Sequence, residues 1–236
     1  MSEHIVTSFD SDLELLRSKI AEMGGLAEKM LGDSTRSLMR RDTSLAQQVI
    51  GSDFRLDDLQ REIEDQAVST IARRQPVAVD LREIISAIRV AGDVERIGDL
   101  AKNTSKRVVA ISGEFQPPKI VVGVQHMSDL VQEQLKDVLD AYAQHDEKKA
   151  LDVWNRDERI DSLYTSIFRE LLTYMMEDTR NITFCTHLLF LAKNIERIGD
   201  HTTNIAETIY FLVTGTTLSS ERPKSDTTSF TTVAAD

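Results

Sequence analysis

The residues best suited to chemistry in this sequence are acidic pairs that recur at a fixed interval. Residues 94–99 read Val-Glu-Arg-Ile-Gly-Asp, and residues 195–200, 101 positions later, read Ile-Glu-Arg-Ile-Gly-Asp. The match extends outward, where Asn103 corresponds to Asn204. A repeat of this length indicates two copies of one structural unit, each with the same Glu-x-x-x-Asp pair. The repeated carboxylates are Glu95, Asp99, Glu196 and Asp200.

Each copy carries a second acidic pair on the segment that precedes the repeat. Asp53 and Asp57 in the first copy correspond, at an offset of 104 residues, to Asp157 and Asp161 in the second. Residues four apart on a helix lie on the same face, with Cβ atoms about 6 Å apart. Each pair is therefore expected to point in one direction from its helix.

The two pairs of each copy are predicted to lie at equal height on neighbouring antiparallel helices. Asp57 and Glu95 are both 19 residues from Pro76. Asp53 and Asp99 are both 23 residues from it. In a helical hairpin that turns at Pro76, residues equidistant from the turn lie side by side. The second copy has the same symmetry about its own turn, so the spacing predicts height in both copies but not the direction of the side chains.

Four carboxylates in one patch repel one another unless a cation lies between them. Hard cations accept ligand sets made only of oxygen, so Mg²⁺, Mn²⁺, Ca²⁺ and iron are candidates, and Zn²⁺ also accepts carboxylates. We therefore expect a divalent or iron-type metal ion at each cluster. Asn103 and Asn204, one turn beyond the last aspartate, are candidates for additional ligands or outer hydrogen-bond partners. The alternative is an ordinary solvated surface whose acids pair with the nearby arginines Arg55, Arg96, Arg159 and Arg197.

Glycines inside the expected helices point to packing rather than to chemistry. Gly98 and Gly199 fall on the apolar stripes of their helices. A glycine in a helix interior costs about 1 kcal/mol relative to alanine. Its presence at the same repeat position predicts that another helix backbone approaches closely there. Gly24 and Gly25 are expected to mark packing or a local bend in the first helix.

Composition and charge exclude several classes of protein. The net charge of −11 argues against general binding to nucleic acid or to anionic lipid, because both require a cationic surface. Cys185 is the single cysteine, so no internal disulfide is expected and a reducing compartment fits. The sequence shows no secretory signal and no run of 18 apolar residues, so we expect a cytoplasmic protein without membrane insertion.

Helical periodicity runs through most of the chain, which has only 4 prolines and 10 glycines. We predict an all-α fold of two tandem, pseudo-symmetric three-helix bundles with six long helices and a disordered C-terminal tail. The predicted helices span residues 8–40, 43–74, 79–112, 118–144, 146–177 and 181–213. The bundles are assigned to residues 1–113 and 118–213, and the Thr/Ser-rich tail to residues 214–236.

Two of the helix starts carry local signals. Asp42 or Thr43 can cap the second helix, because both side chains accept hydrogen bonds from free backbone amides. Asp80 and Glu83 resemble a capping box at the start of the third helix. These signals place the turns between the helices of the first bundle.

Two other classes of function remain open from the residues themselves. One is a metal-dependent hydrolase or oxidase of the helical-bundle type, and the other is a metal-free interaction scaffold. The Glu-x-x-His spacing of di-iron bundles is absent from the helices with Glu-x-x-x-Asp, and no phosphate-binding glycine loop or nucleophile motif occurs. His201 follows Asp200, but Leu100 stands at its counterpart. No residue is therefore assigned a catalytic role.

Four segments together resemble the PhoU family, the accessory and regulatory proteins of bacterial high-affinity phosphate uptake. The resemblance covers about residues 1–215, that is, all of the chain except the tail. The segments are Met23-Gly24-Gly25, residues 74–82 with Arg-Gln-Pro and Asp-Leu-Arg, Tyr174-Met175-Met176-Glu177-Asp178, and the two Glu-Arg-Ile-Gly-Asp repeats.

The resemblance implies two three-helix bundles and a repeated Glu/Asp-x-x-x-Asp motif that binds multinuclear metal clusters in some members. That motif matches all eight acidic positions named above. By resemblance, the protein is a cytoplasmic, non-enzymatic negative regulator of phosphate uptake and of the phosphate-starvation response. It would connect the ATPase subunit of the phosphate transporter to a membrane sensor histidine kinase, and it would form a homodimer.

Overall fold

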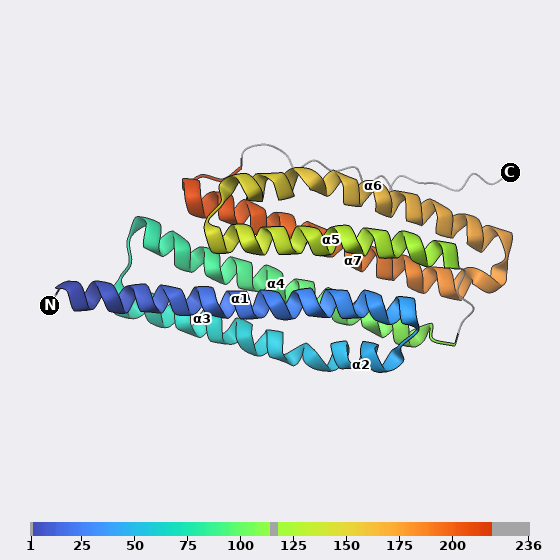
Figure 1. Ribbon diagram of the computed structural model, residues 1–236, viewed down its shortest axis with the longest axis horizontal. Helices are drawn as coiled ribbons and strands as arrows, with labels where there is room; N and C mark the ends of the chain where they lie inside the picture. Colours follow the sequence, from blue (N-terminus) through green and yellow to red (C-terminus); the bar gives the residue numbers. More distant parts are fainter. Residues whose placement is uncertain (1, 114–117, 219–236) are drawn as a thin grey trace.

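The computed structural model describes residues 2–113 and 118–218, which form no β-strand and are almost entirely helical (Figure 1). This confirms the predicted all-α fold of two three-helix bundles. The predicted tail lies outside the described residues except for residues 214–218. The first bundle consists of α1 (Ser2–Arg40), α2 (Thr43–Ser52), α3 (Phe54–Arg74) and α4 (Ala78–Ala110). The second consists of α5 (Pro118–Gln144), α6 (Glu147–Glu177), the short 3₁₀ helix η1 (Thr179–Asn181) and α7 (Ile182–Thr214).

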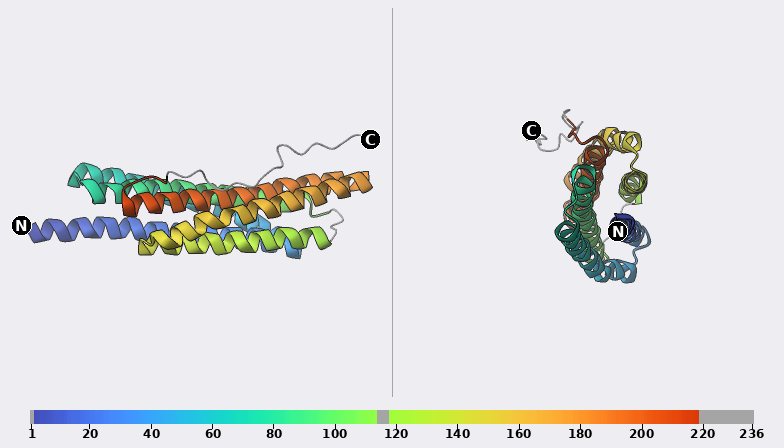
Figure 2. Two further views of the ribbon diagram at one scale, coloured as in Figure 1. Left: turned by 90° about the horizontal axis from the view of Figure 1, so that it is seen from above. Right: turned by 90° about the vertical axis from the view of Figure 1, so that its left-hand side faces the viewer.

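The two bundles lie side by side, and their helices run roughly along the long axis of an elongated molecule (Figure 2). The most extensive contact between them joins α4 to α7, and α1 also packs against α5. One hydrophobic core extends through both bundles. Among the described residues, no helix combines the length and the apolarity needed to cross a bilayer.

The second predicted helix is interrupted at Asp53, which divides it into α2 and α3. The Asp53 backbone stays in the helical region, with φ −56° and ψ −41°. Its carbonyl oxygen accepts from the Leu56 amide at 2.9 Å and from the Asp57 amide at 3.3 Å. The bond to the third residue along the chain is of the tighter 3₁₀ type, so the helix is locally rewound rather than broken. The expectation of one continuous helix was wrong at this position.

Caps at the helix starts agree with one sequence signal and contradict another. Asp42 caps α2, since its carboxylate accepts from the Leu45 amide at 2.9 Å. The expected capping box at Asp80 and Glu83 is not formed, because α4 begins at Ala78 without a side-chain cap. Glu83 instead accepts a 2.6 Å hydrogen bond from Arg17 Nε of α1. Its carboxylate ties two helices of the first bundle together rather than closing the end of one.

The two glycines at equivalent positions of the repeat, Gly98 and Gly199, each lie close to a side chain of another helix. A Cβ atom at Gly98 would overlap Leu56 Cδ1, and one at Gly199 would lie 3.2 Å from Ile160 Cδ1. Leu56 and Ile160 are themselves related by the 104-residue offset. The nearest atoms are therefore side-chain atoms of the preceding helix, which corrects the expectation of an approaching backbone. Gly24 likewise faces Leu139, whereas a Cβ at Gly25 would meet nothing within 4 Å.

These contacts predict a graded response to alanine. Alanine stabilises a helix interior by about 1 kcal/mol relative to glycine, whereas overpacking a core costs about 1–3 kcal/mol. We expect Gly98→Ala to lower the free energy of unfolding by about 1 kcal/mol and Gly199→Ala to change it little. Gly25→Ala should raise it by about 1 kcal/mol. Urea denaturation of the three variants measures the order, and a Gly98→Ala protein as stable as Gly25→Ala would contradict the Leu56 contact.

Candidate metal centres

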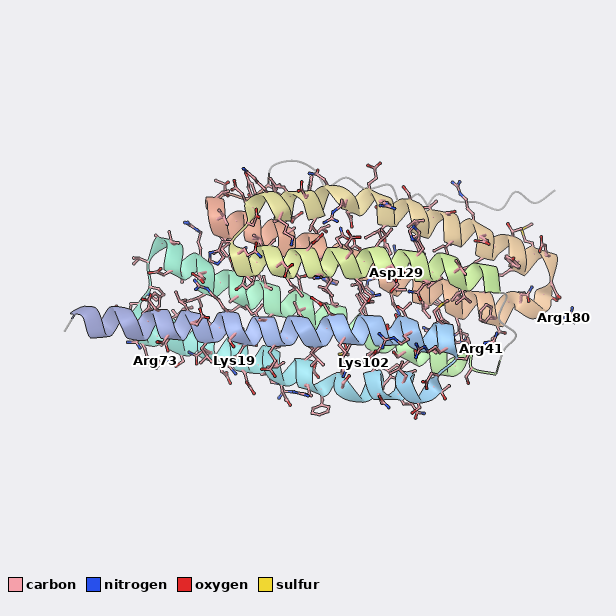
Figure 3. All side chains as sticks on the ribbon, viewed as in Figure 1. Lys19, Arg41, Arg73, Lys102, Asp129 and Arg180 are labelled. Atoms are coloured by element: carbon pink, nitrogen blue, oxygen red, sulfur yellow. The ribbon has the colours of Figure 1, made fainter. Side chains whose placement is uncertain are left out.

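The first cluster consists of Asp53 and Asp57, at the start of α3, and Glu95 and Asp99 on α4. Lys102, labelled in Figure 3, belongs to α4, and its side chain extends to Asp53 at the start of α3. Its ammonium donates to Asp53 Oδ2 and to Asp99 Oδ1, both at 2.5 Å. One nitrogen thus bridges the two carboxylates that the sequence places at equal height. The structure therefore brings Asp53 and Asp99 together and supplies a cation between them.

Electrostatics connect all four acids of the first cluster. Burial raises the pKa of Glu95, repulsion from Asp99, Asp57 and Asp53 raises it further, and Arg96 opposes these effects. Burial would lower the pKa of Lys102, but its hydrogen bonds to Asp53 and Asp99 outweigh this and hold the pKa above the ordinary value. The first cluster is thus a group of mutually repelling carboxylates held by the Lys102 ammonium group and by the Arg96 guanidinium, which lies 3.6 Å from Glu95 and 3.5 Å from Asp99.

The second cluster consists of Asp157 and Asp161 on α6 and of Glu196 and Asp200 on α7. Three of its acids are deeply buried, with exposed fractions of 1% for Asp157, 3% for Asp161 and 4% for Glu196, whereas Asp200 is partly exposed. Lys193 Nζ donates to Glu196 Oε1 at 2.7 Å, and the same ammonium lies 4.8 Å from the centroid of the Tyr164 ring. Each cluster therefore contains a lysine from the helix that carries its Glu-x-x-x-Asp pair.

The Glu196 carboxyl of the second cluster is strongly perturbed by its surroundings. Burial raises its pKa to about 7, with Lys193 acting to lower it and repulsion from Asp200 and Asp161 acting to raise it. Its second oxygen, Oε2, is buried and has no hydrogen-bond partner among the described residues. An unsatisfied buried carboxylate oxygen is costly, which makes this atom a candidate ligand for a cation.

Gly199 also shapes the second cluster. Asp157 Oδ1 lies 3.6 Å from the position that a Cβ at residue 199 would occupy. The missing side chain thus lets the Asp157 carboxylate approach α7, in addition to making room for Ile160. The sequence assigned this glycine to packing alone.

The repeat does not reveal the two lysines that contact the carboxylate clusters, Lys102 and Lys193. Thr203 stands where a second copy of Lys102 would be, and Gly92 stands where a counterpart of Lys193 would be. Comparison of the copies therefore hides both residues. The signal that finds them is local: Lys102 is three residues after Asp99, and Lys193 is three residues before Glu196, which places each on the acidic face of its helix.

The carboxylate oxygens of the two clusters are the kind of ligand that a hard cation accepts. Their side chains, however, are not directed at a common point where such an ion could lie. Within the described residues, no three His, Cys, Asp or Glu side chains are arranged closely enough to hold a metal ion. Two observations still favour a cation: an ammonium group already bridges Asp53 and Asp99, and Glu196 Oε2 has no partner. Ligands could come only from carboxylates in these positions, so the ion would be of the kind that accepts oxygen.

The two asparagines expected beside the clusters face elsewhere. Asn204 Nδ2 donates to Asp93 Oδ1 at 3.2 Å, and Asp93 Oδ1 also lies 2.8 Å from His201 Nδ1. Asn103 Oδ1 accepts from Lys106 Nζ at 3.4 Å. Both asparagines line cavities between α4 and α7. His201 therefore ties α7 to α4 and is not positioned as a ligand of the second cluster.

Comparison with known proteins places this architecture in a family. The family model for the PhoU domain matches residues 20–108 and again residues 124–209, with one match in each bundle. The chain belongs to the PhoU family. Both Glu-x-x-x-Asp pairs lie inside the matched segments, and so do both Asp-x-x-x-Asp pairs. The resemblance inferred from the sequence motifs is thereby confirmed.

Close relatives of this PhoU family member extend over nearly the whole chain. A phosphate-specific transport system accessory protein PhoU homolog of Rhizobium meliloti is 58% identical and covers 96% of this chain and 95% of its own length. The homolog from Caulobacter vibrioides (strain NA1000 / CB15N) is 50% identical, and the match covers 96% of this chain and 98% of the homolog's length. The crystal structure of PhoU from Pseudomonas aeruginosa superposes with a TM-score of 0.86 at 41% identity, covering 88% of this chain and 100% of that one.

A more distant PhoU structure preserves the same fold. The phosphate transport system regulatory protein PhoU from Streptococcus pneumoniae superposes with a TM-score of 0.83 at 27% identity. It covers 89% of this chain and 99% of that one. The paired-bundle architecture is thus common to PhoU proteins whose sequences have diverged widely.

Proposed function

We propose that this PhoU family member is a cytoplasmic negative regulator of phosphate uptake and of the phosphate-starvation response. The observation that carries the proposal is the 58% identity, over 96% of the chain, to a phosphate-specific transport system accessory protein. The family match in both bundles supports it, because it spans all eight cluster carboxylates. The proposed role is regulatory rather than enzymatic.

The regulator is proposed to act as an adaptor. It would contact the ATPase subunit of the high-affinity phosphate transporter and a phosphate-sensing histidine kinase, and it would form a homodimer. The name of the Rhizobium meliloti relative, which makes that protein an accessory of a transport system, supports a transporter contact. The elongated pair of bundles offers long helical faces on which two partners can bind at once (Figure 2).

Deleting the gene tests the regulatory role. We expect alkaline phosphatase to be expressed in phosphate-rich medium in the deletion strain, because a negative regulator of the starvation response is missing. Activity on a chromogenic phosphatase substrate measures the effect. A plasmid copy of the gene is the control and should restore repression. Unchanged repression in the deletion strain would count strongly against the proposal.

We further propose that each carboxylate cluster binds a divalent or iron-type metal ion. Asp53, Asp57, Glu95 and Asp99 would hold it in the first bundle, and Asp157, Asp161, Glu196 and Asp200 in the second. The oxygen-only donor set, the bridging ammonium of Lys102 and the unpaired Glu196 Oε2 support this proposal. Such an ion would supply fixed positive charge that relieves the repulsion within each cluster.

Elemental analysis of reconstituted protein tests the metal sites. Substituting Glu95→Ala and Asp99→Ala together should lower the bound metal by about half, because one of two clusters loses the ligands of one helix. The matched pair Glu196→Ala and Asp200→Ala should lower it by a similar share. Circular dichroism should show that the helices are retained. Wild-type protein that stays metal-free after reconstitution would reject the sites.

A further inference from the structure

A cavity of about 360 Å³ lies between α4 of the first bundle and α7 of the second, apart from both carboxylate clusters. Cationic and carboxamide side chains surround it, together with the rings of His187 and Phe190, and none of the described residues that line it is acidic. We call it the basic cavity. The residues that define it are Asn103, Lys106, Arg107, His187, Phe190 and Asn194.

The two cations of the basic cavity, Lys106 and Arg107, have no acidic partner in the part of the chain that the structure describes. Lys106 Nζ donates a hydrogen bond to the Asn103 amide oxygen at 3.4 Å. In a chain with a net charge of −11, two neighbouring cations without a counterion are unusual. This arrangement attracts an anion from solution.

Arg107 is held in a fixed orientation. Its guanidinium carbon lies 4.8 Å from the centroid of the Phe190 ring, and its Nη1 donates to His187 Nδ1 at 3.5 Å. Stacking on an aromatic ring leaves the edge of the guanidinium free for bidentate hydrogen bonds. Both contacts come from α7, whereas Arg107 belongs to α4. An anion bound here would therefore join the two bundles.

A second cavity, of about 540 Å³, occupies the corresponding place in the repeat and serves as an internal comparison. Asn204 lines it as Asn103 lines the basic cavity. At the 101-residue offset, however, Glu207 replaces Lys106 and Thr208 replaces Arg107. The fold alone therefore does not require positive charge at this position. Of the two cavities at equivalent positions of the repeat, only the basic cavity has a lysine and an arginine at these two positions.

We propose that the basic cavity binds the phosphate group of a small anion, of which inorganic phosphate is the smallest. A guanidinium and an ammonium group supply charge-assisted hydrogen bonds, and the amides of Asn103 and Asn194 supply neutral donors for the remaining oxygens. The volume accommodates phosphate with water, or a small phosphate ester. The choice of phosphate over other oxyanions rests on the proposed function, whereas the positive site itself rests on the geometry.

Isothermal titration calorimetry with inorganic phosphate, on chelator-treated full-length protein, tests the proposal. Chelation removes binding through metal at the carboxylate clusters. We expect saturable binding that weakens as salt is raised, because the attraction is electrostatic. Arg107→Gln should weaken it about tenfold or more, which is the effect of losing one charge-assisted bond. Phosphate should also raise the melting temperature of the wild type, since it binds the folded state.

Arg89→Gln is the matched control. Arg89 lies in the second cavity, with its guanidinium carbon 5.2 Å from the centroid of the Phe211 ring, so the substitution removes the same kind of group. Its phosphate affinity should stay within about twofold of the wild type. Equal losses in the two variants, or no loss in Arg107→Gln, would overturn the assignment of the site.

Parallel titrations with adenosine monophosphate and with sulfate distinguish the source of the anion. Binding of the nucleotide but not of inorganic phosphate, if lost in Arg107→Gln, would support the site and identify a phosphate ester as its ligand. No binding of either phosphate compound, or tighter binding of sulfate than of both, would overturn the proposal. Gene deletion tests the regulatory role independently, so the failure of one proposal can be told from the failure of the other.

Discussion

Glu196→Gln is expected to stabilise the metal-free protein by about 2–3 kcal/mol at pH 8. Burial, with repulsion from Asp200 and Asp161 and against the attraction of Lys193, raises the pKa of Glu196 from 4.5 to about 7. A rise of this size corresponds to about 3 kcal/mol at 1.36 kcal/mol per pKa unit. Glutamine removes the buried charge and keeps an oxygen that can accept the hydrogen bond from Lys193.

The pH dependence of this effect has a definite sign. The folded state holds the Glu196 proton more tightly than the unfolded chain does, so stability falls as the pH rises from 4.5 through about 7. The advantage of Glu196→Gln should therefore shrink from about 2–3 kcal/mol at pH 8 to less than about 1 kcal/mol near pH 4.5. Urea unfolding in the presence of chelator, repeated across this range, measures the difference.

An exposed glutamate on the neighbouring helix provides the control for this prediction. Glu170→Gln, on the surface of α6, should change the free energy of unfolding by no more than about 0.5 kcal/mol at any pH. A Glu196→Gln protein that is less stable than the wild type at pH 8 would show that the charged form is favourably held. The same substitution should weaken metal binding at the second cluster. Stability without metal and affinity for metal are thus expected to change in opposite directions.

Lys102→Met is expected to destabilise the metal-free protein by about 2–3 kcal/mol. The lysine is the bridging donor to Asp53 and Asp99, and Asp53 is only 9% exposed. Breaking a buried ion pair from one side costs about 3–5 kcal/mol, and the partial exposure of Lys102 reduces that figure. Methionine retains the length of the apolar stem, so the change reports mainly the lost charge.

A divalent cation should reverse much of this loss, since it can take the place of the ammonium group between the carboxylates. Thermal unfolding with and without Mn²⁺ measures the recovery, which should be larger for Lys102→Met than for the wild type. Lys106→Met, one turn further along α4, is the control and should change stability little, because Lys106 is exposed and forms no ion pair with a described carboxylate. Metal-free Lys102→Met with wild-type stability would show that the bridge contributes nothing.

Heights along the helices could be predicted from the sequence, whereas directions around them could not. The symmetry of Asp53 and Asp99 about Pro76 correctly placed the two carboxylates side by side, as the shared Lys102 ammonium shows. Their common direction depends on how α3 packs against α4, which Leu56 sets by filling the space at Gly98. Such a contact depends on side-chain volume at both positions, which periodicity does not encode.

Sequence reasoning missed several features, and the reasons differ. The interruption at Asp53 directly follows Gly51 and Ser52, residue types that favour helix ends, so a weak local signal was present but was not used. Glu83 matched a capping-box pattern but pairs with Arg17, a residue 66 positions away. The distant partner Arg17 binds the Glu83 carboxylate, which therefore does not cap α4. Local sequence preference is a weak guide where such a long-range partner is available. Lys102 and Lys193 escaped because an internal comparison detects only what both copies share.

The contact of α4 with α7 has a consequence for how the two copies could diverge. In a dimer of identical bundles, a twofold interface would present every residue twice, so a lysine on one side would imply a lysine on the other. Joining the copies in one chain removes that constraint. Lys106 can therefore face one cavity while its counterpart Glu207 faces the other. Covalent fusion thus converts a symmetric seam into two chemically distinct sites that can be altered one at a time.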